Sequence, residues 1–404
     1  MADILSYGRQ SVSDEDIEAV ARILRSDWLT QGPAVEEFEK RICEVTDATH
    51  AVACNSGTAA LHLAALAAGL ESGKAAIVPA ITFLATANAV RMTGAEVIFA
   101  DVDVQTGRMT GSTLDAAFEK ADRGKQTVRA IFPVHLGGEA SSMPDIATLS
   151  ATRHAIVIED ACHALGGAYP RNDGVRVRVG ACADSAMACF SFHPVKPVTT
   201  AEGGAVTTND DALADHMRRL RSHGMSRTEG GFRNRSEAFD ADGNVNPWYY
   251  EMPEIGWNYR ISDIHSALGT SQLARLREFH ECRASLVRLY RELIAPLAPV
   301  VQVASEVPGV ISGHHLFVAL IDFPRIGITR AAVMKELRKR GVGTQVHYIP
   351  VPWQPYYTDR YGKADYPGAA SYYGRCLSLP LFTAMNESDV CRVAHALAEV
   401  LNLK

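Results

Sequence analysis

Short apolar runs alternate with longer helical stretches through the first half of the chain, and this alternation constrains the fold more than any other feature. Parallel strands cannot be joined by tight turns and need crossover connections, usually helices. Strands that are apolar along their whole length are typical of a sheet covered on both faces. The sequence therefore predicts an α/β fold with a largely parallel sheet. The predicted strands are residues 75–78, 97–100, 130–134, 155–158 and 186–192, and the predicted helices between them include 57–69, 84–92 and 144–150.

The pattern changes after residue 226. Residues 227–252 are rich in Gly, Asn, Asp, Arg and aromatic residues and lack periodicity, so we predict a long loop there. The chain beyond this loop predicts a second, smaller α/β domain. We place the division so that residues 1–255 form an N-terminal segment and the large domain, and residues 256–404 form the small domain. The elements predicted for the small domain are a helical region at 262–293, a strand at 316–321, a helix at 330–340 and a last helix across 390–401.

Composition limits the classes of partner. The chain has 404 residues with 40 Lys plus Arg and 46 Asp plus Glu, a formal net charge of −6, which argues against a general binder of nucleic acid. Its eight cysteines include no Cys-x-x-Cys pair, which favours a reducing compartment. No segment resembles a signal peptide or reaches the roughly 20 apolar residues that span a bilayer. We expect a cytoplasmic protein that binds neither nucleic acid nor membrane.

Several common functional motifs are absent or incomplete. GLESGK at residues 69–74 is one residue short of a phosphate-binding loop and is followed by Ala75 in place of Ser or Thr. The chain contains no H-E-x-x-H or G-x-S-x-G motif, and no G-x-G-x-x-G follows the first strand. These observations argue against nucleotide-dependent dehydrogenases, zinc proteases and serine hydrolases, and we predict no metal ion.

The segment NSGTAALHLAAL, residues 55–66, begins a predicted helix with the small residues Ser56, Gly57 and Thr58. The first N–H groups of a helix have no partner within the helix and bind phosphate groups well. An ordinary capped helix explains the same residues, so this segment alone does not decide between the two.

The segment VIEDACHALGG, residues 157–167, ends a buried strand with Glu159 and Asp160. Ligands of α/β sheets usually bind at this edge, and a carboxylate there can keep a heterocyclic nitrogen protonated. A helix cap or a surface ion pair explains the acid equally well. His163 could flank the same ring or be a structural histidine.

The segment CFSFHPVKPVTTAEGGAV, residues 189–206, places Lys196 between Val195 and Pro197 after an apolar strand. Most lysines are solvated, but burial lowers the pKa of a lysine and leaves a neutral amine that can form a Schiff base. The three segments together supply a phosphate anchor, an acid for a pyridine nitrogen and a lysine for an aldehyde. Pyridoxal phosphate requires all three.

These motifs, in this order, resemble those of the DegT-like family of sugar-nucleotide aminotransferases, which are pyridoxal-phosphate enzymes of fold type I. The resemblance covers nearly the whole chain. It implies an aspartate-aminotransferase-like fold whose large, cofactor-binding domain holds a mostly parallel, seven-stranded sheet. The matching motifs are LTQGP at 29–33, NSGTAAL, ITFLATANAV at 81–90, EDACHALGG, SFHPVKPVTTAEGGAV, RSHGM at 221–225 and GWNYRISDIHSALG at 256–269.

One branch of the family looks most similar, on SFHPVKPVTTAEGG, RSHGM and QVHYIPV at 345–351. That branch aminates carbon 4 of UDP-4-keto-6-deoxy-N-acetyl-altrosamine in pseudaminic acid biosynthesis, which supplies cell-surface glycans. The resemblance implies that a homodimer with a shared active site moves the amino group of L-glutamate to carbon 4 of a UDP-4-keto-6-deoxy-N-acetylhexosamine. Another nucleotide-linked keto-sugar, and amination at carbon 3, stay open.

The resemblance also implies a role for each matching position. Lys196 would form the Schiff base with the cofactor and move the proton, and Asp160 would pair with the pyridinium nitrogen. The remaining cofactor-binding residues would be Gly57, Thr58, Ala59 and Ser191 at the phosphate, Phe83 on the ring face, His163 beside the ring hydroxyl and Asn258 reaching the phosphate from the other subunit. The substrate-binding residues would be Tyr7, Asp27, Trp28, Leu29, Thr30, Gln345, His347 and Tyr348, and Arg260 is a candidate for the carboxylate of glutamate.

Alternatives remain at this point. In the pyridoxamine-dependent sugar dehydratases of the same fold the lysine is replaced, commonly by histidine, so Lys196 argues against them. A regulator could keep the fold and bind sugar or cofactor without turnover. Phe83 could be a core residue, and Asn258 could cap the helix that begins near Ser262. The loop at 227–252 is longer than we expect for the family and could cover the site or extend the dimer contact.

Overall fold

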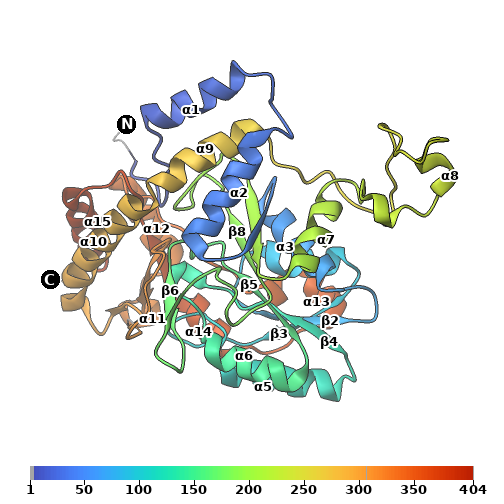
Figure 1. Ribbon diagram of the computed structural model, residues 1–404. Coiled ribbons are helices and arrows are strands. Elements are labelled where there is room, and N and C mark those ends of the chain that lie inside the picture. Colours follow the sequence, from blue (N-terminus) through green and yellow to red (C-terminus); the bar gives the residue numbers. More distant parts are fainter. Residues whose placement is uncertain (1–3, 306, 404) are drawn as a thin grey trace.

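The computed structural model describes residues 4–305 and 307–403, and a seven-stranded sheet lies at its centre (Figure 1). The strand order is β1-β9-β8-β5-β4-β2-β3. Neighbours from β8 to β3 run parallel, whereas β9 is antiparallel to both β1 and β8. The mostly parallel, seven-stranded sheet is therefore confirmed. Its strands are β1 (His50–Cys54), β2 (Ala75–Pro79), β3 (Glu96–Ala100), β4 (Val128–Ile131), β5 (Ile156–Asp160), β8 (Met187–Ser191) and β9 (Gly204–Thr208).

Helices cover both faces of the sheet, because almost every strand position is apolar and buried. One apolar core includes Leu63 of α3 and Met217 of α7, and the other includes Phe38 of α2 and Phe118 of α5. The helices that pack on this sheet are α2 (Pro33–Thr46), α3 (Gly57–Ala67), α4 (Leu84–Met92), α5 (Gly111–Arg123), α6 (Met143–Arg153), α7 (Asp211–Arg221), α13 (Pro355–Tyr361) and α14 (Pro367–Arg375). A small hairpin of β6 (Ala168–Pro170) and β7 (Arg176–Arg178) lies beside them.

The C-terminal part builds its own core on a three-stranded antiparallel sheet of order β10-β11-β12. Helix α10 joins the two cores, since Phe279 packs in the core of the large sheet and Tyr290 in the smaller one. The residue at which one domain ends and the next begins stays a prediction. The elements here are α10 (Leu276–Ile294), β10 (Val301–Gln302), β11 (Phe317–Ile321), α11 (Phe323–Ile326), α12 (Arg330–Lys339), β12 (Cys376–Leu379) and α15 (Glu387–Val400).

The N-terminal helix α1 (Asp14–Leu24) packs on α9 (Asp263–Ala274), together with α2. A capping box begins the helix, because Ser13 and Asp16 exchange side-chain and backbone hydrogen bonds. Of the helices in residues 4–305 and 307–403, none is both long and apolar enough to cross a membrane.

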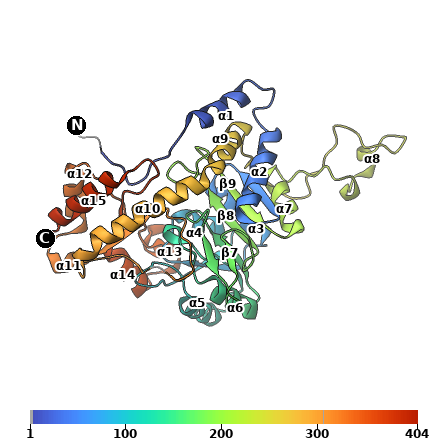
Figure 2. The same cartoon turned by 60° about the vertical axis from the view of Figure 1, so that its left-hand side comes forward.

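An arm formed by residues 227–255 projects away from the body in both views (Figures 1 and 2). Apart from short helical segments, among them α8 (Arg235–Ala238), it is irregular, as the sequence predicts. The Glu251 carboxylate links the two ends of the arm by accepting hydrogen bonds from the backbone N–H groups of Arg233 and Asn234. Trp248 is 72% exposed and Ile255 is 74% exposed, so the arm presents large apolar side chains to its surroundings.

Candidate active site

A cavity of about 470 Å³ opens at the edge of the sheet where β5 and β8 end. The carboxyl ends of parallel strands meet at one edge, and α/β proteins bind ligands there. The start of α3, the segment that follows β8 and residues 345–349 of the C-terminal part all contribute to its wall. The cavity brings together most of the residues predicted from the sequence, namely Tyr7, Gly57, Thr58, Phe83, Asp160, His163, Ser191, Lys196, Gln345, His347 and Tyr348.

Lys196 lies in a tight turn after β8, where its backbone N–H donates to the carbonyl of His193 over 2.9 Å. Its side chain lines the cavity and is partly buried. Burial lowers the pKa of Lys196, and the neighbouring Cys162 and Asp160 oppose that shift. A lysine with a lowered pKa has a larger neutral fraction near pH 7, and the neutral amine is the form that attacks a carbonyl carbon.

Asp160 is the last residue of β5, and only 5% of its surface is exposed. The Thr86 hydroxyl donates to its Oδ2 over 2.6 Å, and the backbone N–H of Cys162 donates to its Oδ1 over 3.2 Å. Its burial excludes a surface ion pair, and its place at the end of a strand excludes a helix cap. The carboxylate is thus held rigidly at the cavity wall.

The support of Asp160 includes a residue pair that sequence reasoning missed. Thr82 and Thr86 lie 2.7 Å apart, oxygen to oxygen, and Thr86 gives its proton to Asp160, so Thr82 must donate to Thr86. Both are fully buried. The spacing of four residues across the start of α4 indicates that the two threonines can contact each other. Nothing in the sequence predicts that this helix packs against the end of β5.

The start of α3 forms one end of the cavity. The Ser56 hydroxyl caps the helix by accepting from the backbone N–H of Ala59 over 3.1 Å. The Ala59 amide is therefore occupied within the chain, and the amides of Gly57 and Thr58 at the first turn are the better candidates for an anion. A Cβ atom on Gly57 would lie 2.7 Å from the Cβ of Ser191, so this approach of the two segments requires glycine.

Two aromatic rings and a histidine form the wall beside Lys196 and Asp160. Phe83 is 55% exposed and therefore not a core residue, and its ring centroid lies 5.8 Å from that of Tyr348. The Tyr348 oxygen lies 3.2 Å from His163 Nε2. Burial lowers the pKa of His163, and the positive charge of Lys196 lowers it further, so this imidazole is neutral.

Residues 345–349 of the C-terminal part also line the cavity. The His347 ring contacts the Tyr7 ring at a centroid distance of 5.3 Å, and its Nδ1 lies 2.7 Å from the Ser378 hydroxyl. Burial lowers the pKa of His347 to about 3. This side offers neutral hydrogen-bonding groups rather than charges.

Some predicted residues lie elsewhere. Of the residues that the structure describes, Asp27–Thr30, Asn258 and Arg260 do not line the cavity of this chain. Thr30 forms an isolated β-bridge with Ser262, and Asn258 forms one with Ser222 and is exposed. Asn258 does not cap α9 either, because the Ser262 side chain accepts the hydrogen bond at that helix start. Their predicted roles stay predictions.

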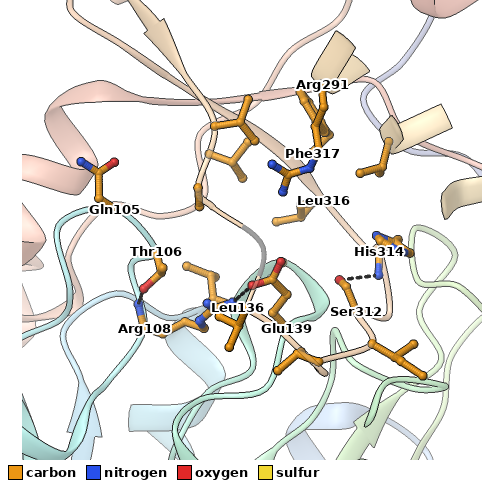
Figure 3. A pocket seen from close by; sticks show the side chains of 18 of the residues that line it. Gln105, Thr106, Arg108, Leu136, Glu139, Arg291, Ser312, His314, Leu316 and Phe317 are labelled. Atoms are coloured by element: carbon orange, nitrogen blue, oxygen red, sulfur yellow. Dashed lines mark hydrogen bonds and ion pairs between the residues drawn. The ribbon is translucent and has the colours of Figure 1, made fainter. Parts of the chain in front are cut away.

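A second cavity, of about 580 Å³, lies between the two parts of the chain (Figure 3). Although it is the larger one, none of its described lining residues is a lysine, and its Arg108 forms an ion pair with Glu139 over 2.5 Å. It shares Leu136 and Gly137 with the turn that lies behind His163. The lysine chemistry therefore belongs to the smaller cavity.

Comparisons with known proteins identify the class of enzyme. The model of the DegT/DnrJ/EryC1/StrS aminotransferase family matches residues 10–398. The spore coat polysaccharide biosynthesis protein SpsC of Bacillus subtilis is 34% identical over 409 residues, covering 98% of this chain and 97% of SpsC. Among solved structures, Helicobacter pylori PseC, an aminotransferase involved in the biosynthesis of pseudoaminic acid, is 28% identical with a TM-score of 0.83, covering 99% of this chain and 100% of PseC. The putative sugar aminotransferase Spr1654 of Streptococcus pneumoniae in its PMP form is 25% identical with a TM-score of 0.84, covering 99% of this chain and 98% of Spr1654.

Proposed function

The chain belongs to the DegT/DnrJ/EryC1/StrS aminotransferase family, and we propose that it transfers the amino group of L-glutamate to carbon 4 of a UDP-4-keto-6-deoxy-N-acetylhexosamine, in a pathway to pseudaminic acid. One observation carries the transaminase chemistry: Lys196, Asp160 and the start of α3 line the same cavity. The likeness to PseC supports the choice of sugar. Another nucleotide-linked keto-sugar is the alternative substrate.

The enzyme uses pyridoxal phosphate, as the family does, and the residues of the cavity fit this cofactor. The space between Gly57 and Ser191 is open only because residue 57 has no side chain. The Gly57 and Thr58 amides with Ser191 would hold the phosphate, Asp160 would hold the ring nitrogen, and Phe83 would cover the ring. His163 would lie beside the ring hydroxyl.

The cofactor supplies an aldehyde that binds amines and a ring that accepts electron density. Lys196 Nζ, kept partly neutral by burial, takes the proton from the α carbon of glutamate in the first half of the reaction. In the second half it delivers a proton to carbon 4 of the sugar. Asp160, fixed by Thr86 and the Cys162 amide, keeps its negative charge in place throughout, so no reorganisation is needed as charge develops.

We also infer a cytoplasmic homodimer with a shared active site. Asn258 is exposed and lies outside its own chain's cavity, as expected for a residue that serves a second subunit. All eight cysteines are free, which fits a reducing compartment. The turn at Asp27–Thr30, with Tyr7, Gln345, His347 and Tyr348, would bind the sugar nucleotide. Arg260 remains the candidate for the glutamate carboxylate.

The first experiment records the visible spectrum of the cofactor-loaded protein before and after glutamate is added. We expect a yellow band that bleaches, followed by release of 2-oxoglutarate. The UDP-4-keto-6-deoxy-N-acetylhexosamine is then added, and mass spectrometry detects the amino sugar. A thymidine-diphosphate 4-keto-6-deoxyhexose is the matched control. Amination of the control alone would refute the proposed sugar while leaving the transaminase chemistry intact, and a band that never bleaches would refute glutamate as donor.

A regulator that binds cofactor or sugar without turnover is the competing function. A rigidly held Asp160 beside a lysine of lowered pKa supports catalysis, because simple binding requires neither. Retention of Lys196 likewise opposes the dehydratase alternative. Turnover in the assay above would eliminate the regulator.

A further inference from the structure

A second histidine stands behind His163, outside the cavity. The ring centroids of His163 and His315 lie 4.3 Å apart, and His315 is only 4% exposed. No hydrogen-bond partner for Nδ1 of His315 exists among the described residues. His315 therefore contacts His163 through the ring itself and not through a hydrogen bond from Nδ1.

Backbone contacts place His315 at this point. The Gly137 carbonyl accepts hydrogen bonds from the backbone N–H groups of His315, over 2.9 Å, and Leu316, over 3.1 Å. At Gly138, where φ is +113°, a Cβ atom would lie 2.7 Å from the backbone nitrogen of His314. The turn at 136–138 therefore lies against the segment that leads into β11. Figure 3 shows Leu136, His314 and Leu316 from the side of the second cavity.

The same turn fixes which nitrogen of His163 carries the proton. The Gly137 backbone N–H donates to His163 Nδ1 over 3.3 Å, so Nδ1 must be the unprotonated nitrogen. In a neutral imidazole the proton then sits on Nε2, which lies 3.2 Å from the Tyr348 oxygen. A ring turned over by 180° would face the Gly137 amide with a carbon atom and leave that amide without an acceptor.

We propose that His315 is a positioning residue: its ring holds the His163 imidazole in the orientation in which Gly137 donates to Nδ1 and Nε2 donates to Tyr348. The Tyr348 oxygen then accepts from His163, so its own proton is directed elsewhere. Tyr348 lines the cavity, and its hydroxyl becomes a hydrogen-bond donor toward whatever is bound there. The last step rests on the proposed function, whereas the arrangement of the two histidines does not.

The groups around the pair keep both imidazoles neutral, as this arrangement requires. Lys196, His347 and His135 face His163, and His163, Lys196, Arg283 and His347 face His315. Each of these groups is basic, and burial disfavours a further positive charge. Removing the His315 ring would let water reach His163, which would then approach the ordinary histidine pKa near 6.5 and sample its second tautomer.

The test is ¹⁵N NMR of histidine side chains in the cofactor-free protein, where the shifts of Nδ1 and Nε2 distinguish the tautomers. H163Q assigns the signals. We expect His163 in the wild-type protein to carry its proton on Nε2 and to stay neutral from pH 8 to 5.5. A wild-type His163 protonated on Nδ1 would overturn the proposal without any variant.

Two substitutions test whether the ring of His315, and not its nitrogen atoms, holds His163 in place. H315A should give mixed His163 tautomers and titration near pH 6.5, and should slow the glutamate half-reaction on the order of tenfold to hundredfold. H315F keeps a flat ring and should preserve the wild-type tautomer and most of the rate. H395A, at an exposed histidine of α15, is the matched control. An unchanged His163 spectrum in H315A, or a loss in folded H315F equal to that in H315A, would contradict the proposal.

Y348F tests the final step. It should leave the His163 tautomer unchanged, because Gly137 sets it, while slowing the half-reaction with the cofactor still bound. A wild-type rate in Y348F would contradict the final step, because the Tyr348 hydroxyl would then donate no hydrogen bond that the half-reaction requires. If the wild-type protein fails to react with glutamate, the proposed donor fails, yet the NMR result still decides the role of His315.

Discussion

The two walls of the active-site cavity differ in chemistry and in how they are built. The wall from the large sheet carries the charged groups, Lys196 and Asp160, each within a few residues of a buried strand. The wall from the C-terminal part carries the neutral His347, which contacts the Tyr7 ring and lies in a segment between elements. Under the proposed function, the first wall carries out the reaction chemistry and the second recognises the sugar substrate. Substitutions in the first wall should therefore lower turnover, and substitutions in the second should raise the KM for the sugar.

The sharpest test of this contrast is Lys196→Ala. We expect turnover to fall by about 10⁴-fold or more, because the proton carrier is lost, while the overall fold stays intact. Release of 2-oxoglutarate measures the effect. Lys335→Ala, at an exposed lysine of α12, is the control and should be fully active. Substantial turnover in the Lys196 variant would show that this wall does not carry the chemistry.

Asp160→Asn keeps the shape of the side chain but removes its charge. We expect a fall in turnover of about 10²- to 10³-fold, since a fixed charge at the reacting ring is lost. Because Asp160 raises the pKa of Lys196, the variant should also lower that pKa further. In the cofactor-free protein, the pH dependence of Lys196 acylation by an amine-specific reagent reports this shift. A shift toward higher pH would contradict the assigned electrostatics.

Buried neutral histidines occur in both parts of the chain. Burial lowers the pKa of His62, on α3, to about 4 and that of His347 to about 3. In the unfolded chain each titrates near 6.5, so below that pH the unfolded state takes up protons that the folded state does not. The free energy of unfolding should therefore fall from pH 7.5 to 5.5, by about 1.4 kcal/mol for each histidine.

Urea unfolding of the cofactor-free protein at the two pH values measures this loss. H62Q removes one of the two histidines and should reduce this loss of stability by about 1.4 kcal/mol. H395A should not change the loss. Equal stability of the wild-type protein at pH 7.5 and 5.5 would contradict the burial of these neutral rings.

His347→Ala tests the recognition wall and should have the smallest effect. We expect the KM for the keto-sugar to rise by about tenfold, as for the loss of one good hydrogen bond. The rate of the glutamate half-reaction and the yellow colour should be unchanged. An equal loss in both half-reactions would mean that the two walls are not functionally distinct.

Much of the first wall could be predicted from the sequence because its residues follow directly from strands. The strand that ends at Asp160 and the strand before Lys196 are apolar runs, and the topology of a parallel sheet brings their ends together. Two strands, β1 and β9, which lie side by side at one end of the sheet, were not predicted. β9 runs antiparallel and follows β8 without a helix between them, so it does not fit the strand–helix alternation that revealed the others. β1 reads HAVAC, and its two alanines favour a helix and not a strand.

The sequence by itself determined the class of fold, the cofactor and the candidate residues for binding it, because each of these depends on local patterns and on motifs that stay contiguous along the chain. The tertiary structure alone decided what supports those residues. Thr86 reaches Asp160 across 74 positions, Tyr348 reaches His163 across 185, and His315 arrives behind His163 through the turn at Gly137. Local sequence patterns do not predict such contacts, because they depend on packing between elements that are distant in the sequence. A sequence pattern does not indicate which faces of those elements will pack together.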